Sequence, residues 1–483
     1  MGQLEHLMRL VNSIGSPFDS NQRHNKKQVY ILNMENLDIL QRYGLFDAKV
    51  PRYTSYPPAN RFENGIGQRN QIQWLARTPV ANPVSIYIHI PFCKRLCWFC
   101  ACRTQGTKTR APLNAYVDII KREFEAVSKI MVEKPPMQRL HLGGGTPTLL
   151  NMLQMRKLLN IVFSEFSIGK NFEFSVEIDP TEASSEVLDE LQQWGMNRAS
   201  IGVQDFNPHV QKAIGRFQSF EQTQMIMDQL RHQGVSKINF DLLYGLPLQT
   251  KDSLIETIDK VTLLDPDRIA LYGYAHVPHA SKRQIMINAD ELPSPQMRYF
   301  MAKDSAKKLG LVGYQKVGID HFAKPSDDLV KAVQQGRLHR NFQGYTDDNC
   351  ETLIGFGASA ISKFPEGYSQ NAVSTAAYVA RIADGGTAGH KGYKMHGDDI
   401  MIAKMIEMLM SDFSIDLMEI KTNFASIQNP ETYFDLILGE FGEALDYKNS
   451  KISIKPGYEE LVRIIAASLD SGSIEHSNHS LAI

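Results

Sequence analysis

The sequence predicts an α/β protein: an incomplete (βα) barrel with an N-terminal segment over its mouth and a small, mainly helical, winged-helix-like C-terminal domain. Two observations carry this prediction. Short apolar or β-branched runs recur from residue 84, and each is followed by a stretch of helical periodicity. This alternation is typical of parallel strands joined by crossover helices. After residue 385 several glycines interrupt the pattern, and a helix-rich tail follows.

Six segments are expected to form the strands of the barrel, at 84–90, 139–143, 173–178, 198–203, 237–243 and 267–275. Helical periodicity fills the stretches between them. Residues 115–132 place Tyr116 and Ile120 on one helical face, and residues 184–194 repeat the pattern. Six such units predict an open barrel, whose active site belongs at the C-terminal ends of the strands.

The chain divides into four predicted parts. Residues 1–33 show no sustained periodicity and are expected to be a disordered or non-native extension. Met34 opens a helical pattern and is expected to be the natural start, which mass spectrometry of the native N-terminus would test. Residues 34–83 are expected to cover the substrate, 84–385 to form the barrel, and 386–483 to form the C-terminal helical domain.

Composition and charge limit the classes of protein. The 483 residues are 43% hydrophobic, and 52 Lys and Arg balance 53 Asp and Glu. The chain can therefore bury a full core, and nothing global points to nucleic acid or an anionic membrane. The longest apolar runs, such as 86–92, are too short to span a bilayer, and no secretory signal opens the chain. A cytoplasmic protein is expected. Because the total charge is near zero, any anion-binding site must depend on a local group of basic residues.

Four of the five cysteines lie in one loop after the first predicted strand, at Cys93, Cys97, Cys100 and Cys102. In a reducing compartment such a group indicates metal ligation or redox chemistry rather than disulfides. The spacing C-x3-C-x2-C allows three thiolates to hold three irons of a [4Fe-4S] cluster and leaves the fourth iron open to a small molecule. Cys350 stands apart and is expected to be a small buried residue.

Two other chemistries of this loop stay open. A structural zinc site normally takes four ligands in two separated pairs, and no second Cys or His pair follows at suitable spacing. A thioredoxin-like redox pair at Cys97 and Cys100 would leave Cys93 and Cys102 unexplained. The aromatic Phe99, just before the third cysteine, would act as an apolar shield in each case.

The motif C-x3-C-x-aromatic-C at the start of a βα barrel resembles the radical S-adenosylmethionine superfamily. Within it, the chain resembles the oxygen-independent coproporphyrinogen III oxidases from about residue 34 to the C-terminal domain. Cys102 and four segments carry this resemblance: Pro-Arg-Tyr-Thr-Ser-Tyr-Pro at 51–57, Tyr-Ile-His-Ile-Pro-Phe-Cys at 87–93, Gly-Gly-Gly-Thr-Pro-Thr at 143–148 and Asn-Phe-Gln-Gly-Tyr-Thr at 341–346. It implies an oxygen-labile [4Fe-4S] cluster held by Cys93, Cys97 and Cys100, and two molecules of S-adenosylmethionine.

A glycine run at 143–145 ends the second predicted strand, where glycine lets a ligand approach the backbone, and Thr146 adds a hydroxyl. Alone, this pattern also fits a plain strand-to-helix turn. Glu177 brings a carboxylate to the end of the third strand, either for a ligand or for a salt bridge. The resemblance assigns a first S-adenosylmethionine site to Gly144, Glu177, Tyr87 and Ile361.

Later strand ends carry Gln204, Asp241 and Ala275, and Arg216 follows the fourth strand. Alone, each is unremarkable, since a strand-end Asp often caps a helix. The resemblance assigns a second S-adenosylmethionine site to these four residues together with Gly145 and Thr146. Two bound cofactors suit a reaction that is performed twice.

Further residues have open roles. The resemblance places Phe342 and Gln343 near the cofactors, as candidate catalytic residues with Glu177, and leaves Cys102 to help transfer hydrogen or electrons. His89 is either functional or a packed core residue. Arg52 and Tyr53 either present a cation and a phenol to a carboxylated substrate or form a structural lid.

The activity that the resemblance implies is the anaerobic oxidative decarboxylation of coproporphyrinogen III to protoporphyrinogen IX, a coproporphyrinogen dehydrogenase reaction of haem biosynthesis. A 5'-deoxyadenosyl radical would take a hydrogen from each of two propionates, and loss of carbon dioxide and an electron would leave vinyl groups. The four substrate carboxylates should make basic residues such as Arg52 and Arg216 important. A low-potential donor such as flavodoxin or ferredoxin would supply electrons, and a monomer without nucleic-acid or membrane partners is expected.

A related branch of the family, the haem-binding chaperones, is the alternative. That branch lacks the fourth cysteine and the segment at 51–57, and both are present here. Another radical enzyme, such as a tetrapyrrole-modifying methyltransferase, would leave the N-terminal segment unexplained.

Overall fold

The computed structural model describes residues 36–425, 429–470 and 479–483, so the predictions for residues 1–33 and for Met34 lie outside the described residues. Its centre is a curved twelve-stranded sheet in the order β16-β15-β14-β13-β1-β4-β5-β6-β7-β8-β10-β9. The six predicted strands form its parallel part, as β1 Val84–Ile90, β4 Met137–Gly144, β5 Ile168–Ile178, β6 Arg198–Gln204, β7 Lys237–Tyr244 and β8 Arg268–Gly273.

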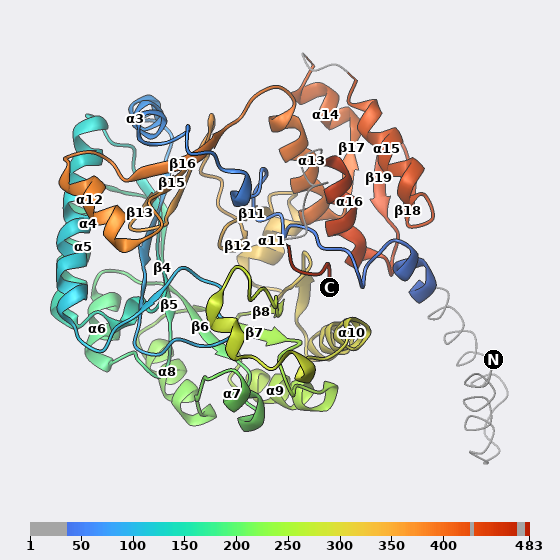
Figure 1. The fold of residues 1–483 in the computed structure, drawn as a ribbon, viewed down its shortest axis with the longest axis horizontal. Helices are drawn as coiled ribbons and strands as arrows, with labels where there is room; N and C mark the ends of the chain where they lie inside the picture. Colours follow the sequence, from blue (N-terminus) through green and yellow to red (C-terminus); the bar gives the residue numbers. More distant parts are fainter. Residues whose placement is uncertain (1–35, 426–428, 471–478) are drawn as a thin grey trace.

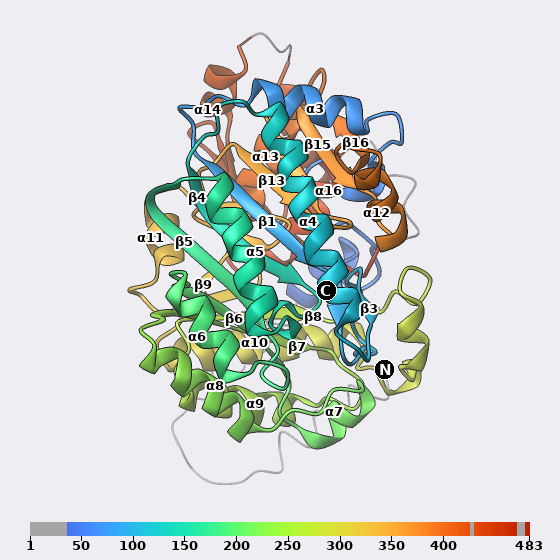
Figure 2. The same ribbon diagram turned by 90° about the vertical axis from the view of Figure 1, so that its left-hand side faces the viewer.

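Crossover helices cover the outside of this parallel part, as Figures 1 and 2 show. They are α4 Ala111–Ile130, α5 Met152–Glu165, α6 Ser185–Gln193, α7 Pro208–Ala213, α8 Phe220–His232, α9 Lys251–Leu263 and α10 Pro295–Leu311. The predicted helical face of α4 is buried at Tyr116 and Ile120. Side chains of Asn151, Ser219 and Thr250 form capping boxes that begin α5, α8 and α9. The barrel prediction is confirmed.

Further strands, most of them antiparallel to their neighbours, extend the sheet at both edges. Beyond β8 lie β10 His321–Ala323 and β9 Gln315–Val317. On the other side β13 Thr352–Phe356 runs parallel to β1 and continues into β14 Ile361–Phe364, β15 Gly367–Asn371 and β16 Gly389–Lys394. The outermost strands β9 and β16 are not paired with each other, so the barrel is open in the described residues.

Shorter elements complete the barrel region. They are the paired strands β2 Phe92–Cys93 and β3 Gln105–Gly106, the hairpin β11 His339–Asn341 and β12 Gly344–Thr346, and the helices α3 Gln68–Arg77, α11 Asp328–Gln334 and α12 Thr375–Ala383. Five 3-10 turns are described, at Ala59–Arg61, Pro147–Leu149, Lys282–Met286, Ala289–Glu291 and Glu459–Leu461.

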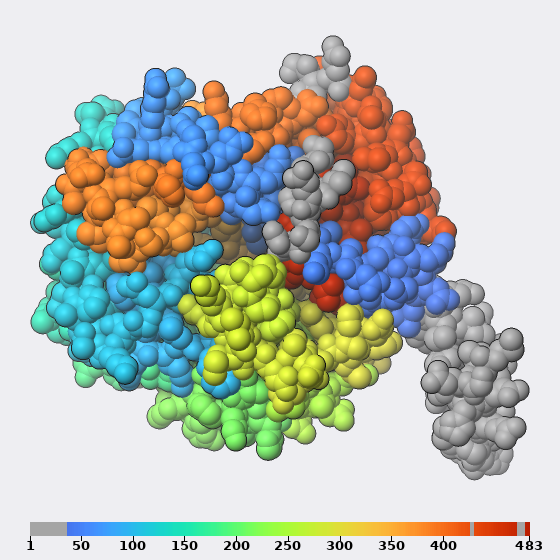
Figure 3. Space-filling model, viewed as in Figure 1, coloured from blue at the N-terminus to red at the C-terminus, as the bar shows by residue number. Residues whose placement is uncertain are grey.

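The C-terminal region is mainly helical, as predicted. Its helices are α13 Asp399–Asp412, α14 Leu417–Asn423, α15 Glu431–Phe441 and α16 Val462–Leu469, beside a small antiparallel sheet of β17 Ser414–Asp416, β18 Leu445–Lys448 and β19 Lys451–Ile454. The N-terminal segment shares its hydrophobic core: Phe46, Tyr53 and Tyr56 are buried in the same cluster as Met405 and Leu409. Figure 3 shows this segment, in blue, between the barrel and the C-terminal helices.

None of the described helices is both long and apolar enough to cross a membrane. The boundaries drawn at residues 34, 84 and 386 stay predictions.

Candidate active site

A cavity of about 720 Å³ lies inside the barrel, at the C-terminal ends of the parallel strands. Fifteen predicted site residues line it: Tyr87, Cys93, Cys97, Cys100, Cys102, Gly144, Gly145, Thr146, Glu177, Gln204, Arg216, Asp241, Phe342, Gln343 and Ile361. Ala275 is not part of this lining, and its carbonyl accepts a hydrogen bond from Gln284 Nε2 at 3.1 Å. The fold therefore brings together segments that lie more than 200 residues apart.

The cysteine loop is held in place by hydrogen bonds from two distant segments. The Trp98 amide donates to the Ile214 carbonyl at 3.0 Å. Gln284 Nε2 donates to the carbonyl of Phe99 at 2.7 Å, and Ser281 Oγ to that of Cys100 at 3.0 Å. These bonds fix the backbone that carries the thiols along the cavity wall.

The thiols themselves receive N–H donors. Arg216 Nη1 lies 3.6 Å from Cys97 Sγ, and the Cys102 amide donates to Cys100 Sγ at 3.4 Å. Hydrogen bonds to sulfur are a recurrent feature of iron–sulfur ligation, where they help set the reduction potential. Among the described residues no three His, Cys, Asp or Glu side chains gather around a position for a single metal ion. Three thiols on one wall, two of them with N–H donors, suit a multi-iron cluster.

The glycine run at 143–145 lies against the site at every position. A Cβ atom at Gly143 would stand 2.6 Å from Glu177 Oε1, and one at Gly144 would stand 2.6 Å from the His89 ring. A Cβ atom at Gly145 would stand 2.5 Å from the Phe92 carbonyl oxygen. Gly144 also has a φ of +112°, which favours glycine. All three positions therefore need glycine because protein atoms lie this close, and since Gly144 and Gly145 also line the cavity we call this run the glycine cradle.

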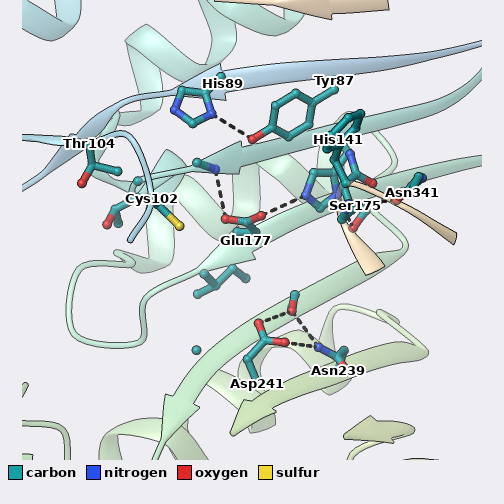
Figure 4. Close-up of a pocket in the computed structure, with 18 of the residues that line it drawn as sticks. Tyr87, His89, Cys102, Thr104, His141, Ser175, Glu177, Asn239, Asp241 and Asn341 are labelled. Carbon is teal, nitrogen blue, oxygen red and sulfur yellow. Dashed lines mark hydrogen bonds and ion pairs between the residues drawn. The ribbon is translucent and has the colours of Figure 1, made fainter. Parts of the chain in front are cut away.

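Glu177 is an ionised carboxylate at this cradle. The Gly144 amide donates to its Oε2 at 3.0 Å, and His141 Nε2 lies 3.3 Å from its Oε1 (Figure 4). Burial opposes its charged form, but the hydrogen bonds from His141 and Gly144 outweigh burial and lower its pKa. The side chain is still 39% exposed because it faces the cavity. It can therefore accept hydrogen bonds from a cationic ligand.

His89 connects the first strand to the cysteine loop. Its Nε2 lies 3.1 Å from the Arg103 carbonyl, which can only accept, so Nε2 carries the proton. Its Nδ1 then accepts from the Tyr87 hydroxyl at 2.9 Å. Burial lowers the pKa of His89, which keeps the ring neutral. His89 thus lies in the cavity wall with a hydrogen bond at each of its two ring nitrogens.

Polar groups also line the side of the cavity formed by β6 and β7. Ser200 Oγ and Asn239 Nδ2 donate to the Asp241 carboxylate at 2.8 and 2.9 Å. Burial nevertheless raises the pKa of Asp241. Gln204 ends β6 with a φ of +67°, an unusual conformation for a residue with a side chain. This side supplies the groups assigned to a second cofactor molecule.

Arg216 is already engaged by protein groups. Its Nη1 donates to Asp179 Oδ2 at 3.0 Å, and its Nη2 donates to the Gly202 carbonyl at 2.7 Å. With the contact to Cys97 Sγ, these bonds tie the guanidinium to the cysteine loop. The structure thus links Arg216 to Cys97, one of the predicted cluster ligands, a contact that the sequence did not indicate.

Several residues that line the cavity were not predicted from the sequence. His141 and Ser175 lie two residues before Gly143 and Glu177, on the same strand faces, and Ser175 Oγ lies 3.0 Å from His141 Nδ1. The alternation of side chains along a strand could have identified both. Further down the same faces lie charged residues at the N-terminal ends of the strands, among them Arg139, Glu173, Arg198 and Arg268.

Arg52 and Tyr53 do not line the active-site cavity. The Tyr53 hydroxyl donates to Asp470 Oδ2 at 3.3 Å, and the ring is buried. Arg52 Nη2 donates to the Gly273 carbonyl at 2.6 Å. The contacts of Tyr53 favour the structural-lid alternative for that residue.

Comparisons with known proteins agree with this geometry. Residues 87–261 match the radical SAM superfamily. The chain is 45% identical over 452 residues to an oxygen-independent coproporphyrinogen III oxidase of Paracoccus denitrificans, covering 93% of this chain and 100% of the relative. An oxygen-independent coproporphyrinogen III oxidase of Cereibacter sphaeroides is also 45% identical, again over 93% of this chain and 100% of the relative.

The solved structure of coproporphyrinogen III oxidase (HemN) from Escherichia coli, described as a radical SAM enzyme, superposes with a TM-score of 0.83 at 33% identity. The match covers 88% of this chain and 100% of that one. The chain therefore belongs to the oxygen-independent coproporphyrinogen III oxidase family of radical S-adenosylmethionine enzymes.

Proposed function

We propose that this protein converts coproporphyrinogen III to protoporphyrinogen IX without oxygen, by oxidative decarboxylation of two propionates. The observation that carries the proposal is the single cavity in which Cys93, Cys97 and Cys100 meet the glycine cradle and Glu177. Relatives at 45% identity over their whole length bear the name of this activity.

Each group in the cavity has a role in this proposal. Cys93, Cys97 and Cys100 would hold the [4Fe-4S] cluster. When bound, the cluster and S-adenosylmethionine supply the 5'-deoxyadenosyl radical that removes hydrogen from the substrate. Gly144 and Glu177 would bind the methionine ammonium of the first cofactor molecule, because an ionised carboxylate complements a cation. Their fixed positions would orient the cofactor and exclude water around it.

A second cofactor molecule would lie toward β6 and β7. Gln204, Asp241 and Arg216 would contact it, beside Gly145 and Thr146. Phe342 and Gln343 follow β11 and would contact the substrate or the cofactors from the opposite wall. Ala275 lies outside the cavity lining and its carbonyl is already bonded to Gln284, so the other five residues would hold this molecule.

The partners and the location belong to the same proposal. A low-potential donor such as flavodoxin or ferredoxin would reduce the cluster, and the protein would act as a monomer in the cytoplasm. The cysteine loop supports a cytoplasmic location, because ligand thiols must stay reduced to bind iron and the cytoplasm is a reducing compartment.

The test is turnover under anaerobic conditions. The reconstituted protein is incubated with reductant, S-adenosylmethionine and coproporphyrinogen III, and the porphyrins are separated by chromatography after oxidation. Protoporphyrin is expected. If no protoporphyrin forms and the protein instead binds haem tightly, the haem-chaperone function replaces the proposal.

A further inference from the structure

A second cavity, of about 520 Å³, lies across the barrel wall from the active-site cavity. Leu271 and Gly273 of β8 line it, whereas Tyr272 between them lines the active-site cavity. Successive residues of a strand face opposite sides, so the two cavities flank one strand. The second cavity is bordered by β8, α10 and α16, and we call it the basic pocket. In Figure 1 these elements meet near the C-terminus.

Cationic side chains outnumber carboxylates in the basic pocket. Seven Lys and Arg residues line it against four Asp and Glu residues. One of those carboxylates, Asp304, is paired with Lys251, which lies outside the lining. Another, Asp320, pairs with His321 at 2.7 Å and lies 3.8 Å from Arg340. The lining therefore carries an excess of positive charge.

Three arginines of the pocket, Arg52, Arg298 and Arg463, are hydrogen-bonded to neutral partners. Arg52 Nη2 and Arg298 Nη2 donate to carbonyl oxygens at 2.6 and 2.7 Å. Arg463 donates to the carbonyls of residues 50, 51, 481 and 482. Carbonyl oxygens satisfy N–H groups but supply no counter-charge. Burial, together with the nearby charges of Arg52 and Arg340, lowers the pKa of Arg463 to about 9.

Two arginines also keep unpartnered N–H groups. Nε and Nη1 of Arg340 and Nε of Arg298 are buried without a hydrogen-bond partner among the described residues. The Arg340 side chain is only 5% exposed and stacks 4.5 Å from the Tyr345 ring centroid. A buried guanidinium with free donors is unfavourable. Water could accept these hydrogen bonds, but an anion would also neutralise the charge.

We propose that the basic pocket binds an organic molecule with several carboxylates. Guanidinium groups pair with carboxylates through two parallel N–H···O bonds. Phe322, Val462 and Ala306 in the lining give the carbon skeleton of such a ligand an apolar surface. The volume is that of a small-molecule site and exceeds the size of one carboxylate. The pocket is separate from the active-site cavity, so this inference stands apart from the proposed reaction.

Two kinds of ligand carry several carboxylates and could occupy the basic pocket. One is a small polycarboxylate with a site of its own, and the other is the set of propionates on a tetrapyrrole. Titration calorimetry on the full-length, cluster-loaded protein would use citrate as the first probe and coproporphyrin III as the second. At least one probe should bind in a one-to-one complex whose affinity falls with added salt.

The variants Arg298→Gln and Arg340→Gln should weaken this binding at least tenfold, and Arg298→Lys should recover part of it. Lys308→Gln is the matched control, because Lys308 lies on the same helix but pairs with Asp259 outside the lining. Thermal unfolding and cluster absorbance would verify that each variant is folded and loaded.

The pattern of results separates the sources. Citrate binding that the arginine variants weaken, with coproporphyrin binding unchanged, shows a separate polycarboxylate ligand. Coproporphyrin binding that these variants weaken shows a tetrapyrrole in the pocket. If both folded variants bind both probes as the unaltered protein does, the proposal is overturned. Turnover is measured separately, so this failure would leave the proposed reaction untouched.

If neither arginine variant folds, the unaltered protein still tests the pocket. Phenylglyoxal modifies accessible arginines, and mass spectrometry maps the modified positions. A bound probe should protect Arg52 and Arg298 but not the exposed Arg42. Equal modification of Arg52 and Arg298 with and without both probes would overturn the proposal.

Discussion

Cys97 differs from its three neighbouring cysteines in having a buried guanidinium against its sulfur. Arg216 is anchored by Asp179 and the Gly202 carbonyl, so its Nη1 stays 3.6 Å from Cys97 Sγ. Positive charge and N–H donors near a cluster favour its reduced, more negative state. Arg216 is therefore expected to act as a positioning residue that raises the reduction potential.

The first prediction concerns this residue. Arg216→Gln should lower the midpoint potential of the cluster, because it removes a charge and weakens the donor to Cys97. A redox titration followed by electron paramagnetic resonance measures it. Arg95→Gln is the control, since Arg95 bonds to Phe217 and Thr181 and to no sulfur. Equal potentials in Arg216→Gln and the unaltered protein would exclude the tuning role.

The second prediction concerns the cluster ligands. Cys93→Ala should abolish both the brown cluster colour and the formation of 5'-deoxyadenosine, because two thiolates cannot hold the cluster in place. Cys350→Ala should keep both, since Cys350 does not line the cavity. Absorbance and chromatography measure the two properties. Retention of either in Cys93→Ala would mean that the ligand assignment is wrong.

The third prediction concerns His141, which holds Glu177 ionised. His141→Ala should weaken S-adenosylmethionine binding by about tenfold, since a charge-assisted hydrogen bond contributes roughly 1.5–3 kcal/mol. Equilibrium dialysis measures this without turnover. Ser175→Ala should have a smaller effect, because Ser175 contacts His141 rather than Glu177. An unchanged affinity in His141→Ala would contradict the assignment of Glu177.

At the scale of elements, Glu123 joins helix α4 to the β13 and β15 side of the sheet. Its carboxylate accepts hydrogen bonds from the Gly357 amide, from Asn371 Nδ2 and from the Tyr378 hydroxyl, each at 2.7 Å. Burial raises its pKa to about 7, although these donors oppose the shift. One ionisable side chain thus links α4 to three later segments.

The fourth prediction is a pH dependence of stability. The pKa of Glu123 is higher in the folded chain than its ordinary value of 4.5. The folded state therefore binds the proton more tightly, and its contribution to stability is lost as pH rises from about 4.5 to about 7. Urea unfolding at several pH values should show this loss, on the order of 2 kcal/mol.

Glu123→Gln serves as the control for this prediction, because an amide does not titrate. Its free energy of unfolding should vary less with pH than that of the unaltered protein over the same interval. Parallel pH profiles for the two proteins would exclude Glu123 as the source.

Close packing between β4 and its neighbouring elements also explains the glycine run. Gly143, Gly144 and Gly145 allow β4 to pass close to Glu177, the His89 ring and the Phe92 carbonyl. A side chain at Gly145 would push against the start of the cysteine loop, whereas one at Gly143 or Gly144 would collide with Glu177 or with the His89 ring. The sequence pattern indicated a close approach at this strand end, and the neighbouring side chains and the Phe92 carbonyl explain why all three positions need glycine.

At the scale of the molecule, the N-terminal segment is tied to the C-terminal region. Asp470 accepts hydrogen bonds from Tyr53 and Arg61, and Arg463 bonds to carbonyls of both segments. The Asp470 side chain is fully buried, whereas Arg61 is partly exposed. Segments at opposite ends of the chain therefore form one core beside the barrel.

The fifth prediction tests this connection. Asp470→Asn should destabilise the protein by about 3 kcal/mol, because it leaves the Arg61 charge without its buried partner. Hydrogen exchange should increase at residues 50–62 and stay unchanged in the β strands of the barrel. Glu443→Gln, which breaks the exposed pair with Arg42, should change neither. Unchanged exchange at residues 50–62 in Asp470→Asn would contradict the connection.

The sequence by itself determined the six parallel strands, their crossover helices and the cysteine loop after the first strand. These features are local, since alternation, helical periodicity and cysteine spacing each depend on neighbouring residues. The family resemblance of the motifs implied that Gly144 and Glu177 share one site, which agrees with the barrel prediction because parallel strands bring their C-terminal ends to one mouth.

Only the tertiary structure decided the long-range contacts. It placed Arg216 against Cys97, 119 residues earlier in the chain, and moved Arg52 from the active site to the basic pocket. It also left Ala275 outside the cavity lining and brought His141 to Glu177. Such contacts depend on how separate elements pack, and no local pattern in the sequence encodes the distance between two side chains from different elements.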